Sequence, residues 1–133
     1  MVSPDTIRTT VHSYAQAVSA LDAGACAALF APDCVLYYPG QPTMRGRDAV
    51  QEYYQRVARP LTALELRGDA VFPVADGAAV KWTLHATGKN DRTAAAEGVN
   101  VFAINGESRI EWLRLYFDAS VLAPLLQGSS PVS

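Results

Sequence analysis

The hydrophobic positions at the start of the chain recur with helical spacing. Ser3 followed by Pro4 is typical of a helix N-cap and the first helical residue. Apolar side chains then recur at steps of four and three, which places them on one face of a helix: Ile7, Val11, Tyr14, Val18 and Leu21. The pattern predicts a helix that ends near Asp22.

Two further helices and a short strand are predicted before the middle of the chain. Residues 23–31 favour a second helix, which Pro32 would end. Residues 34–38 alternate as a strand that stops at a Pro-Gly pair. A third helix is predicted over residues 48–57, with its apolar side facing inward.

The second half of the chain reads as strands. Asp76-Gly77 and Asn105-Gly106 are turn signals of two long hairpins, and a looser turn over residues 88–92 joins them. The order of elements therefore indicates an α+β domain in which helices pack on one face of a curved, mostly antiparallel sheet. We expect a single domain over residues 1–127 and a flexible tail over residues 128–133, which has nothing to anchor it.

The last predicted strand carries large side chains on both of its faces. Leu113, Leu115 and Phe117 alternate with Trp112, Arg114 and Tyr116. One face should meet the core, while the face with Trp112 and Tyr116 is more apolar than a solvated face requires. This pattern predicts a homodimer formed through the outer face of the sheet.

Composition excludes several classes of protein. The chain has 133 residues, of which 50% are hydrophobic, and a net charge of −2 without a basic stripe, so nucleic-acid binding is not expected. It has neither eighteen consecutive apolar residues nor a signal-peptide pattern, which predicts a cytoplasmic protein outside the membrane. Cys26 and Cys34 belong to no metal-binding motif, so we expect free buried thiols and no metal.

Asn100 is the most unusual polar residue in the predicted strands. Alternation aims it toward the same face as Phe102 and Ile104, where a carboxamide without partners would cost about 1–3 kcal/mol. Tyr14 and Tyr38 also lie on apolar faces of their segments. Either these groups satisfy one another in the core, or they converge on an apolar cavity and bind a ligand; we favour the binding site.

Several stretches of the chain carry a family resemblance. They are Tyr14–Val18 with Leu21–Gly24, Leu29–Val35, Gly46–Val50 with Tyr53-Tyr54, and Trp112–Asp118. In these stretches the chain resembles the nuclear transport factor two-like superfamily, and in particular its ketosteroid isomerase-like and SnoaL-like polyketide cyclase branches. The resemblance implies a cone-shaped fold in which three N-terminal helices and a strongly curved sheet enclose a hydrophobic pocket.

The resemblance also implies roles for individual residues. The tyrosine that holds an oxyanion in ketosteroid isomerases falls on Tyr14, and Tyr54 falls on a tyrosine that hydrogen-bonds to it in some members. Phe30 replaces a third tyrosine of that network. The aspartate base falls on Tyr38, a poor base at neutral pH, and the oxyanion aspartic acid falls on Asn100, whose NH₂ can still donate.

The base is therefore the missing part of the expected site. Leu115 stands where related epoxide hydrolase-like and SnoaL-like members often carry an inward acid. Glu97 is expected on the outer face, paired with Lys81 or Arg114, unless a bulge turns it inward as the base. Asp118 is expected to cap the next segment. Tyr38 either moves a proton or only closes the cavity mouth. His12 and His85 are expected at the surface.

Together these residues predict a small cofactor-independent isomerase or cyclase for a hydrophobic oxygenated molecule, such as a polyketide or terpenoid intermediate. Tyr14 and Asn100 would donate hydrogen bonds to its oxygen, with Tyr38 as the third catalytic candidate. A non-catalytic ligand-binding or dimeric accessory protein on the same fold is the alternative. The expected substrate contacts are Phe30, Tyr54, Trp82, Leu84, Phe102, Leu113 and Phe117.

Overall fold

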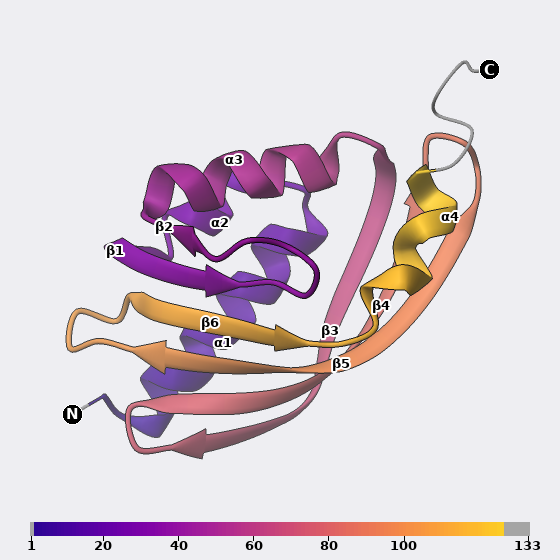
Figure 1. Cartoon of the computed structure of the whole chain (residues 1–133). Helices are drawn as coiled ribbons and strands as arrows, with labels where there is room; N and C mark the ends of the chain where they lie inside the picture. The colour runs from indigo at the N-terminus through magenta and orange to yellow at the C-terminus, as the bar shows by residue number, and fades with distance from the viewer. Residues whose placement is uncertain (1, 127–133) are drawn as a thin grey trace.

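The computed structural model of the chain describes residues 2–126, and the predicted tail over residues 128–133 lies outside them. The first part of the chain forms three helices and two strands, and the rest forms four strands followed by a short helical segment; all six strands belong to one sheet (Figure 1). The helical elements are α1 (Pro4–Ser19), α2 (Ala23–Ala27), α3 (Arg47–Ala58), the 3₁₀ turn η1 (Ala119–Leu122) and α4 (Ala123–Leu126). The strands are β1 (Phe30–Tyr37), β2 (Met44–Arg45), β3 (Leu61–Val74), β4 (Gly77–Gly88), β5 (Thr93–Ile104) and β6 (Ile110–Tyr116).

Helix α1 begins as predicted but ends earlier. The Ser3 hydroxyl accepts a hydrogen bond from the backbone N–H of Thr6 at 3.1 Å, so Ser3 is the N-cap. The helix stops at Ser19 instead of running to Asp22 because Leu21 adopts a left-handed conformation with φ +57°. Asp22 instead caps α2, and its carboxylate accepts from the N–H of Ala25 at 3.0 Å.

The predicted end of the helix over residues 23–31 and the predicted start of the strand over residues 34–38 were wrong. Helix α2 ends at Ala27, and β1 starts at Phe30 and continues through Pro32. Phe30 is paired in parallel with Ile110 of β6, and a register shift before Val35 accommodates the proline, which has no N–H to give to a ladder. The pairing with a strand 80 positions away along the chain decides this boundary.

The sheet has the strand order β2-β1-β6-β5-β4-β3. Strands β1 and β6 are parallel, and every other neighbouring pair is antiparallel. The two predicted hairpins are confirmed as β3–β4 and β5–β6. The short strand β2 and the C-terminal elements η1 and α4 were not predicted. In Figure 1 the long strands β3 to β5 curve strongly, and α1 and α3 lie on one side of the sheet.

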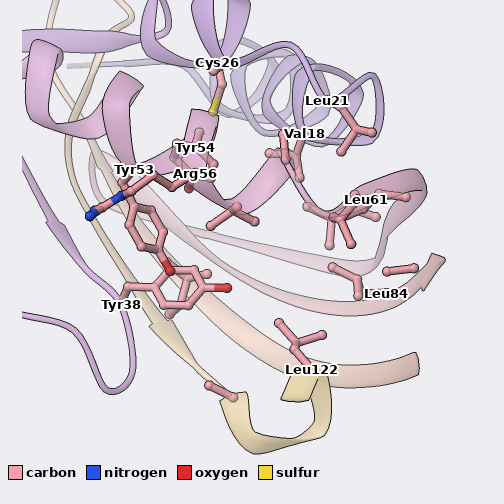
Figure 2. Close-up of a pocket in the computed structure, with 18 of the residues that line it drawn as sticks. Val18, Leu21, Cys26, Tyr38, Tyr53, Tyr54, Arg56, Leu61, Leu84 and Leu122 are labelled. Atoms are coloured by element: carbon pink, nitrogen blue, oxygen red, sulfur yellow. The ribbon is translucent and has the colours of Figure 1, made fainter. Parts of the chain in front are cut away.

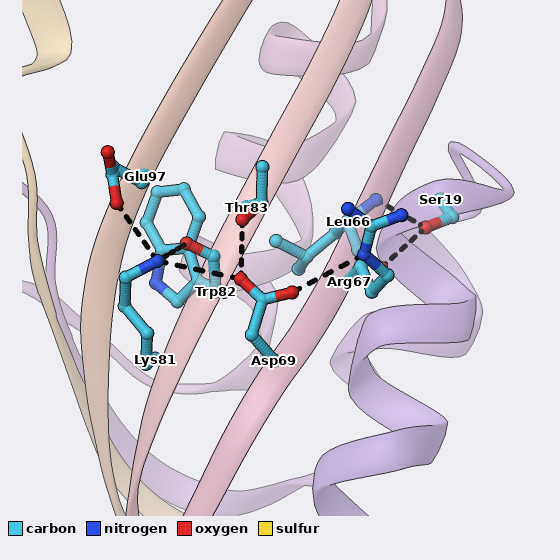
Figure 3. Close-up of polar contacts among 8 residues, drawn as sticks. All are labelled: Ser19, Leu66, Arg67, Asp69, Lys81, Trp82, Thr83 and Glu97. Atoms are coloured by element: carbon cyan, nitrogen blue, oxygen red, sulfur yellow. Dashed lines mark hydrogen bonds and ion pairs between the residues drawn. The ribbon is translucent and has the colours of Figure 1, made fainter.

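A bulge in β3 contributes to this curvature. The register between β3 and β4 shifts between Gly68 and Ala70, which leaves Asp69 as the extra residue. On the outer face its carboxylate accepts a 2.5 Å hydrogen bond from the Thr83 hydroxyl and pairs with Arg67 and Lys81 (Figure 3). These contacts hold the bulged residue in place, so the strand bends at a defined position.

The C-terminal segment closes one end of the fold. Leu125 is buried with Leu61 and Ala86 in a small hydrophobic cluster that is separate from the main core. The side chain of Asn90, in the turn between β4 and β5, donates to the carbonyl oxygen of Pro124 at 3.0 Å. Through these contacts η1 and α4 lie against the far ends of β4 and β5.

Candidate functional site

A largely apolar cavity of about 400 Å³ lies between the helices, the inner face of the sheet and the C-terminal segment. Its volume falls within the range of small-molecule sites. Tyr38 and Tyr53 lie on one side of it, and Leu21, which follows α1, lies on the other with leucine side chains from β3, β4 and η1 (Figure 2). A few polar groups therefore face a mainly hydrophobic space.

Tyr14 and Tyr54 bring two hydroxyl groups together at the cavity wall. Tyr14 lies on the inner face of α1 and Tyr54 on that of α3, and their oxygens are 2.5 Å apart. Burial raises the pKa of both tyrosines well above the ordinary value of 10.0, so both keep their protons at neutral pH. The predicted contact between them is confirmed, and both residues line the cavity.

Asn100 is oriented by a neighbour that the sequence did not indicate. It is 2% exposed, and its Oδ1 accepts a 2.7 Å hydrogen bond from Nε1 of Trp82. Trp82 pairs with Gly98 across β4 and β5, where a Cβ on Gly98 would lie 2.7 Å from the indole Cζ2. The glycine therefore leaves room for the ring to lie across β5 and reach the carboxamide.

Tyr38 follows β1 and packs between two aromatic rings. Its ring centroid is 4.9 Å from that of Tyr53 and 5.5 Å from that of Phe117. Burial raises the pKa of Tyr38, an effect that its hydrogen bond with Tyr53 opposes. A hydroxyl that keeps its proton at neutral pH is a donor or an acid and a poor base.

The cavity offers no evident carboxylate base. Among the described residues that line it, the only acidic one is Asp22, which is exposed and caps α2. Glu97 lies on the outer face in an ion pair with Lys81 at 3.0 Å, as predicted, and the strand does not turn it inward. Asp118 is exposed and accepts hydrogen bonds from the backbone and hydroxyl of Ser120, so its predicted capping role is confirmed.

The predicted substrate contacts divide into two groups. Tyr54, Trp82, Leu84 and Phe117 line the cavity. Phe30, Phe102 and Leu113 are instead buried in the main core and do not border the cavity. The rings of Phe30 and Phe102 pack edge-on against Tyr14, with centroids 6.4 and 5.3 Å from its own. Alternation identified their inward face, but it cannot separate a cavity wall from the layer behind it.

Some lining residues had no assigned role in the sequence analysis. Tyr53 and Leu115 both showed inward-facing spacing, so a signal existed for them. The lining residues of the C-terminal segment, Ala119, Leu122 and Leu125, follow the last predicted strand and gave no comparable signal. Cys26 also borders the cavity, and burial raises the pKa of its thiol to about 12, which makes it a poor nucleophile.

Other side chains that carry chemistry lie away from the cavity or are inert. His12 and His85 are exposed, as predicted, and Cys26 and Cys34 are both buried free thiols. Within residues 2–126, no three His, Cys, Asp or Glu side chains gather where they could hold a metal ion. No helix in this part of the chain has the length and apolar character needed to cross a membrane.

The fold agrees with what comparison with known proteins shows. A family model described as a SnoaL-like domain matches residues 11–112. The chain belongs to the SnoaL-like family. This SnoaL-like protein is also 31% identical over 112 residues to a steroid Δ-isomerase from Nocardioides simplex, an alignment that covers 84% of this chain and 89% of the relative.

Solved structures confirm the fold of this SnoaL-like protein. A nuclear transport factor 2-like protein of unknown function from Burkholderia pseudomallei superposes with a TM-score of 0.80 at 22% identity, covering 92% of this chain and 98% of the other. A Mycobacterium tuberculosis protein in complex with estradiol-17β-hemisuccinate gives a TM-score of 0.76 at 21% identity, with coverage of 87% and 96%. At these identities the likeness concerns the fold.

Proposed function

We propose that this SnoaL-like protein is a cofactor-independent isomerase or cyclase that acts on a hydrophobic, oxygenated small molecule of the polyketide or terpenoid type. The observation that carries the proposal is the presence of two neutral donor groups, the Tyr14 hydroxyl and the Asn100 carboxamide, at the wall of one apolar cavity. The relation to a steroid Δ-isomerase and the fold shared with a protein that holds a steroid ester support it.

In this mechanism the donors stabilise negative charge on a substrate oxygen. If Tyr54 donates to Tyr14, the proton of Tyr14 is available to a carbonyl, enolate or epoxide oxygen in the cavity. Asn100 supplies a second N–H. Preorganised donors in a water-poor site contribute about 3–4 kcal/mol to lowering a barrier. This contribution suits a substrate that is intrinsically reactive once its oxygen is polarised.

Tyr38 and the aromatic walls complete the proposed site. Tyr38 keeps its proton, so it acts as a further hydrogen-bond donor to the substrate oxygen. Trp82 and Phe117 pack edge to face with centroids 5.2 Å apart and form a rigid wall. Such a wall holds a flexible substrate in one reactive conformation, which lowers the entropic part of the barrier.

The alternative is a non-catalytic binding protein with the same cavity. The position of Asp22 favours it, because the only acid among the described lining residues is exposed and engaged as a helix cap. A reaction that needs a strong protein base has no candidate there. Binding of a hydrophobic ligand without turnover would use the same donors and walls.

Two measurements separate these functions. A thermal-shift screen of planar hydrophobic ketones and phenols should raise the melting temperature for ligands that enter the cavity. Turnover of the ligands that bind is then compared in wild type, Tyr14→Phe and Asn100→Leu, with the exposed Tyr116→Phe as the control. Loss of turnover in the first two supports the enzyme, whereas unchanged turnover in both rules it out as described. Binding without any turnover supports the alternative.

We also propose that the protein forms a homodimer through the outer face of the sheet. The register places Val99 beside Tyr116 and Ala103 beside Trp112, and the exposed side chains of β3, Phe72 and Val74, extend the same apolar surface. Trp112 and Tyr116 are 38% and 52% exposed. An apolar surface of this kind on one sheet face fits a second copy of the same chain.

A further inference from the structure

The hydrogen bond between Trp82 and Asn100 fixes which atoms of the carboxamide face the cavity. An indole N–H can only donate, so the carboxamide atom that lies 2.7 Å from Trp82 Nε1 must be the oxygen. Oδ1 is therefore turned toward Trp82. The NH₂ group is the part of Asn100 left for a ligand, and it has no hydrogen-bond partner among the described residues.

The packing around Trp82 makes this orientation rigid. Trp82 and Asn100 are each 2% exposed. Phe117 packs edge-on against the indole, and the backbone of Gly98 lies beneath it. A flip of the carboxamide would place its NH₂ against the indole N–H, which leaves two donors facing each other in a buried site.

We propose that Trp82 is a positioning residue that makes this end of the cavity a hydrogen-bond donor, so that the site selects ligands with an acceptor oxygen over isosteric alcohols. The inference rests on the proposed function, because it concerns the oxygen bound by Tyr14 and Asn100. A ketone oxygen can accept from both groups. An alcohol in the same place can accept too, but its own proton finds no acceptor on Asn100.

The test compares a matched ketone and alcohol, 1-tetralone and 1-tetralol, by isothermal titration calorimetry. We expect wild type to bind the ketone about tenfold more tightly or better, as an unsatisfied buried hydroxyl proton requires. In Trp82→Phe the ring is retained but the N–H is lost, so Asn100 can turn its oxygen to the alcohol. The ketone-to-alcohol preference should then fall to about twofold or less.

Trp112→Phe is the matched control, because Trp112 lies on the outer face of the sheet and the described part of the chain has no third tryptophan. It should keep the wild-type preference. A general loss of packing in Trp82→Phe would weaken both ligands equally and leave their ratio unchanged, and that result would overturn the inference.

Nuclear magnetic resonance of the wild type provides a second test that does not depend on the folding of a variant. The indole N–H of Trp82 should exchange slowly with solvent, and 1-tetralone should shift the NH₂ protons of Asn100 while this N–H stays protected. Rapid exchange of the Trp82 N–H in the ligand-free protein would overturn the inference but leave the proposed function standing. Equal binding of ketone and alcohol by wild type would also do so. Binding of neither probe would overturn the inference together with the proposed function.

Discussion

The hydroxyl oxygens of Tyr14 and Tyr54 lie 2.5 Å apart, although the two residues are 40 positions apart in the chain. The contact joins α1 to α3 at the cavity wall, and both side chains are less than a tenth exposed. Each hydroxyl depends on the other because both are buried. The pair therefore contributes to stability as well as to the proposed chemistry.

Replacing either tyrosine of this pair should destabilise the protein. Tyr14→Phe or Tyr54→Phe leaves the remaining hydroxyl buried without its partner, which costs about 1–3 kcal/mol. The double variant leaves no unsatisfied hydroxyl, so its loss of stability should be smaller than the sum of the two single losses. Urea denaturation of the four proteins measures this coupling. Strictly additive losses would show that the two hydroxyls do not interact.

Alkaline pH should reduce stability through the same tyrosines. Burial raises the pKa of Tyr14 and Tyr54 well above 10.0 in the folded protein. Their contribution is fully present below about pH 10, where the unfolded chain also keeps its phenol protons. Above that pH the unfolded chain releases protons that the folded protein retains, so the free energy of unfolding falls by about 1.4 kcal/mol per pH unit for each tyrosine.

Denaturant unfolding measures this effect as the free energy of unfolding between about pH 8 and pH 11.5, which brackets the reference pKa of tyrosine. The double Tyr14→Phe, Tyr54→Phe variant should show a shallower decline than wild type. Tyr116→Phe, which alters an exposed side chain, is the control and should follow the wild-type curve. Identical slopes in the double variant and wild type would contradict the buried, protonated state of the pair.

A side chain at Gly98 should destabilise the protein. A Cβ there would lie 2.5 Å from the carbonyl oxygen of Tyr116 and 2.7 Å from both Phe117 Cβ and Trp82 Cζ2. Because two of these atoms belong to backbone or to a Cβ, they cannot move aside easily, and Gly98→Ala should cost about 1–3 kcal/mol. Gly106→Ala, where a Cβ meets nothing within 4 Å, is the control. Equal melting temperatures for the two variants would contradict the close packing at Gly98.

The proposed dimer should dissociate when a charge is placed on the outer sheet face. Trp112→Glu puts a carboxylate within this apolar surface, where burial against a second copy would be costly. Sedimentation velocity at micromolar concentration should show a dimer for wild type and a monomer for the variant. A monomeric wild type under these conditions would refute the proposal.

The acids outside the cavity should not affect turnover. Glu97 is 75% exposed in its ion pair with Lys81, and Asp118 is engaged with Ser120. Once a substrate is found, Glu97→Gln and Asp118→Asn should therefore keep wild-type kcat/KM. A loss of tenfold or more in either, equivalent to about 1.4 kcal/mol of transition-state stabilisation, would identify the missing base.

Hydrophobic spacing and turn residues predicted most of the helices and strands. The start of β1 was not predicted, because it depends on pairing between strands that are far apart in the sequence. Helical spacing and the Ser3-Pro4 signal located α1, because capping and amphipathicity act within a few residues. The start of β1 at Phe30 depends on pairing with Ile110, which no local pattern contains. In the site, alternation placed Asn100 inward, but it gave no sign that the indole of Trp82 would reach across Gly98 to bind it.

The C-terminal segment gives the cavity a wall that is separate from its donor groups. Ala119, Leu122 and Leu125 border the cavity from the chain end, whereas Tyr14 and Asn100 belong to α1 and β5. Changes in the size of Ala119 or Leu122 can therefore alter the length of ligand admitted without disturbing the groups that bind its oxygen. These two positions therefore offer a starting point for redesigning the pocket.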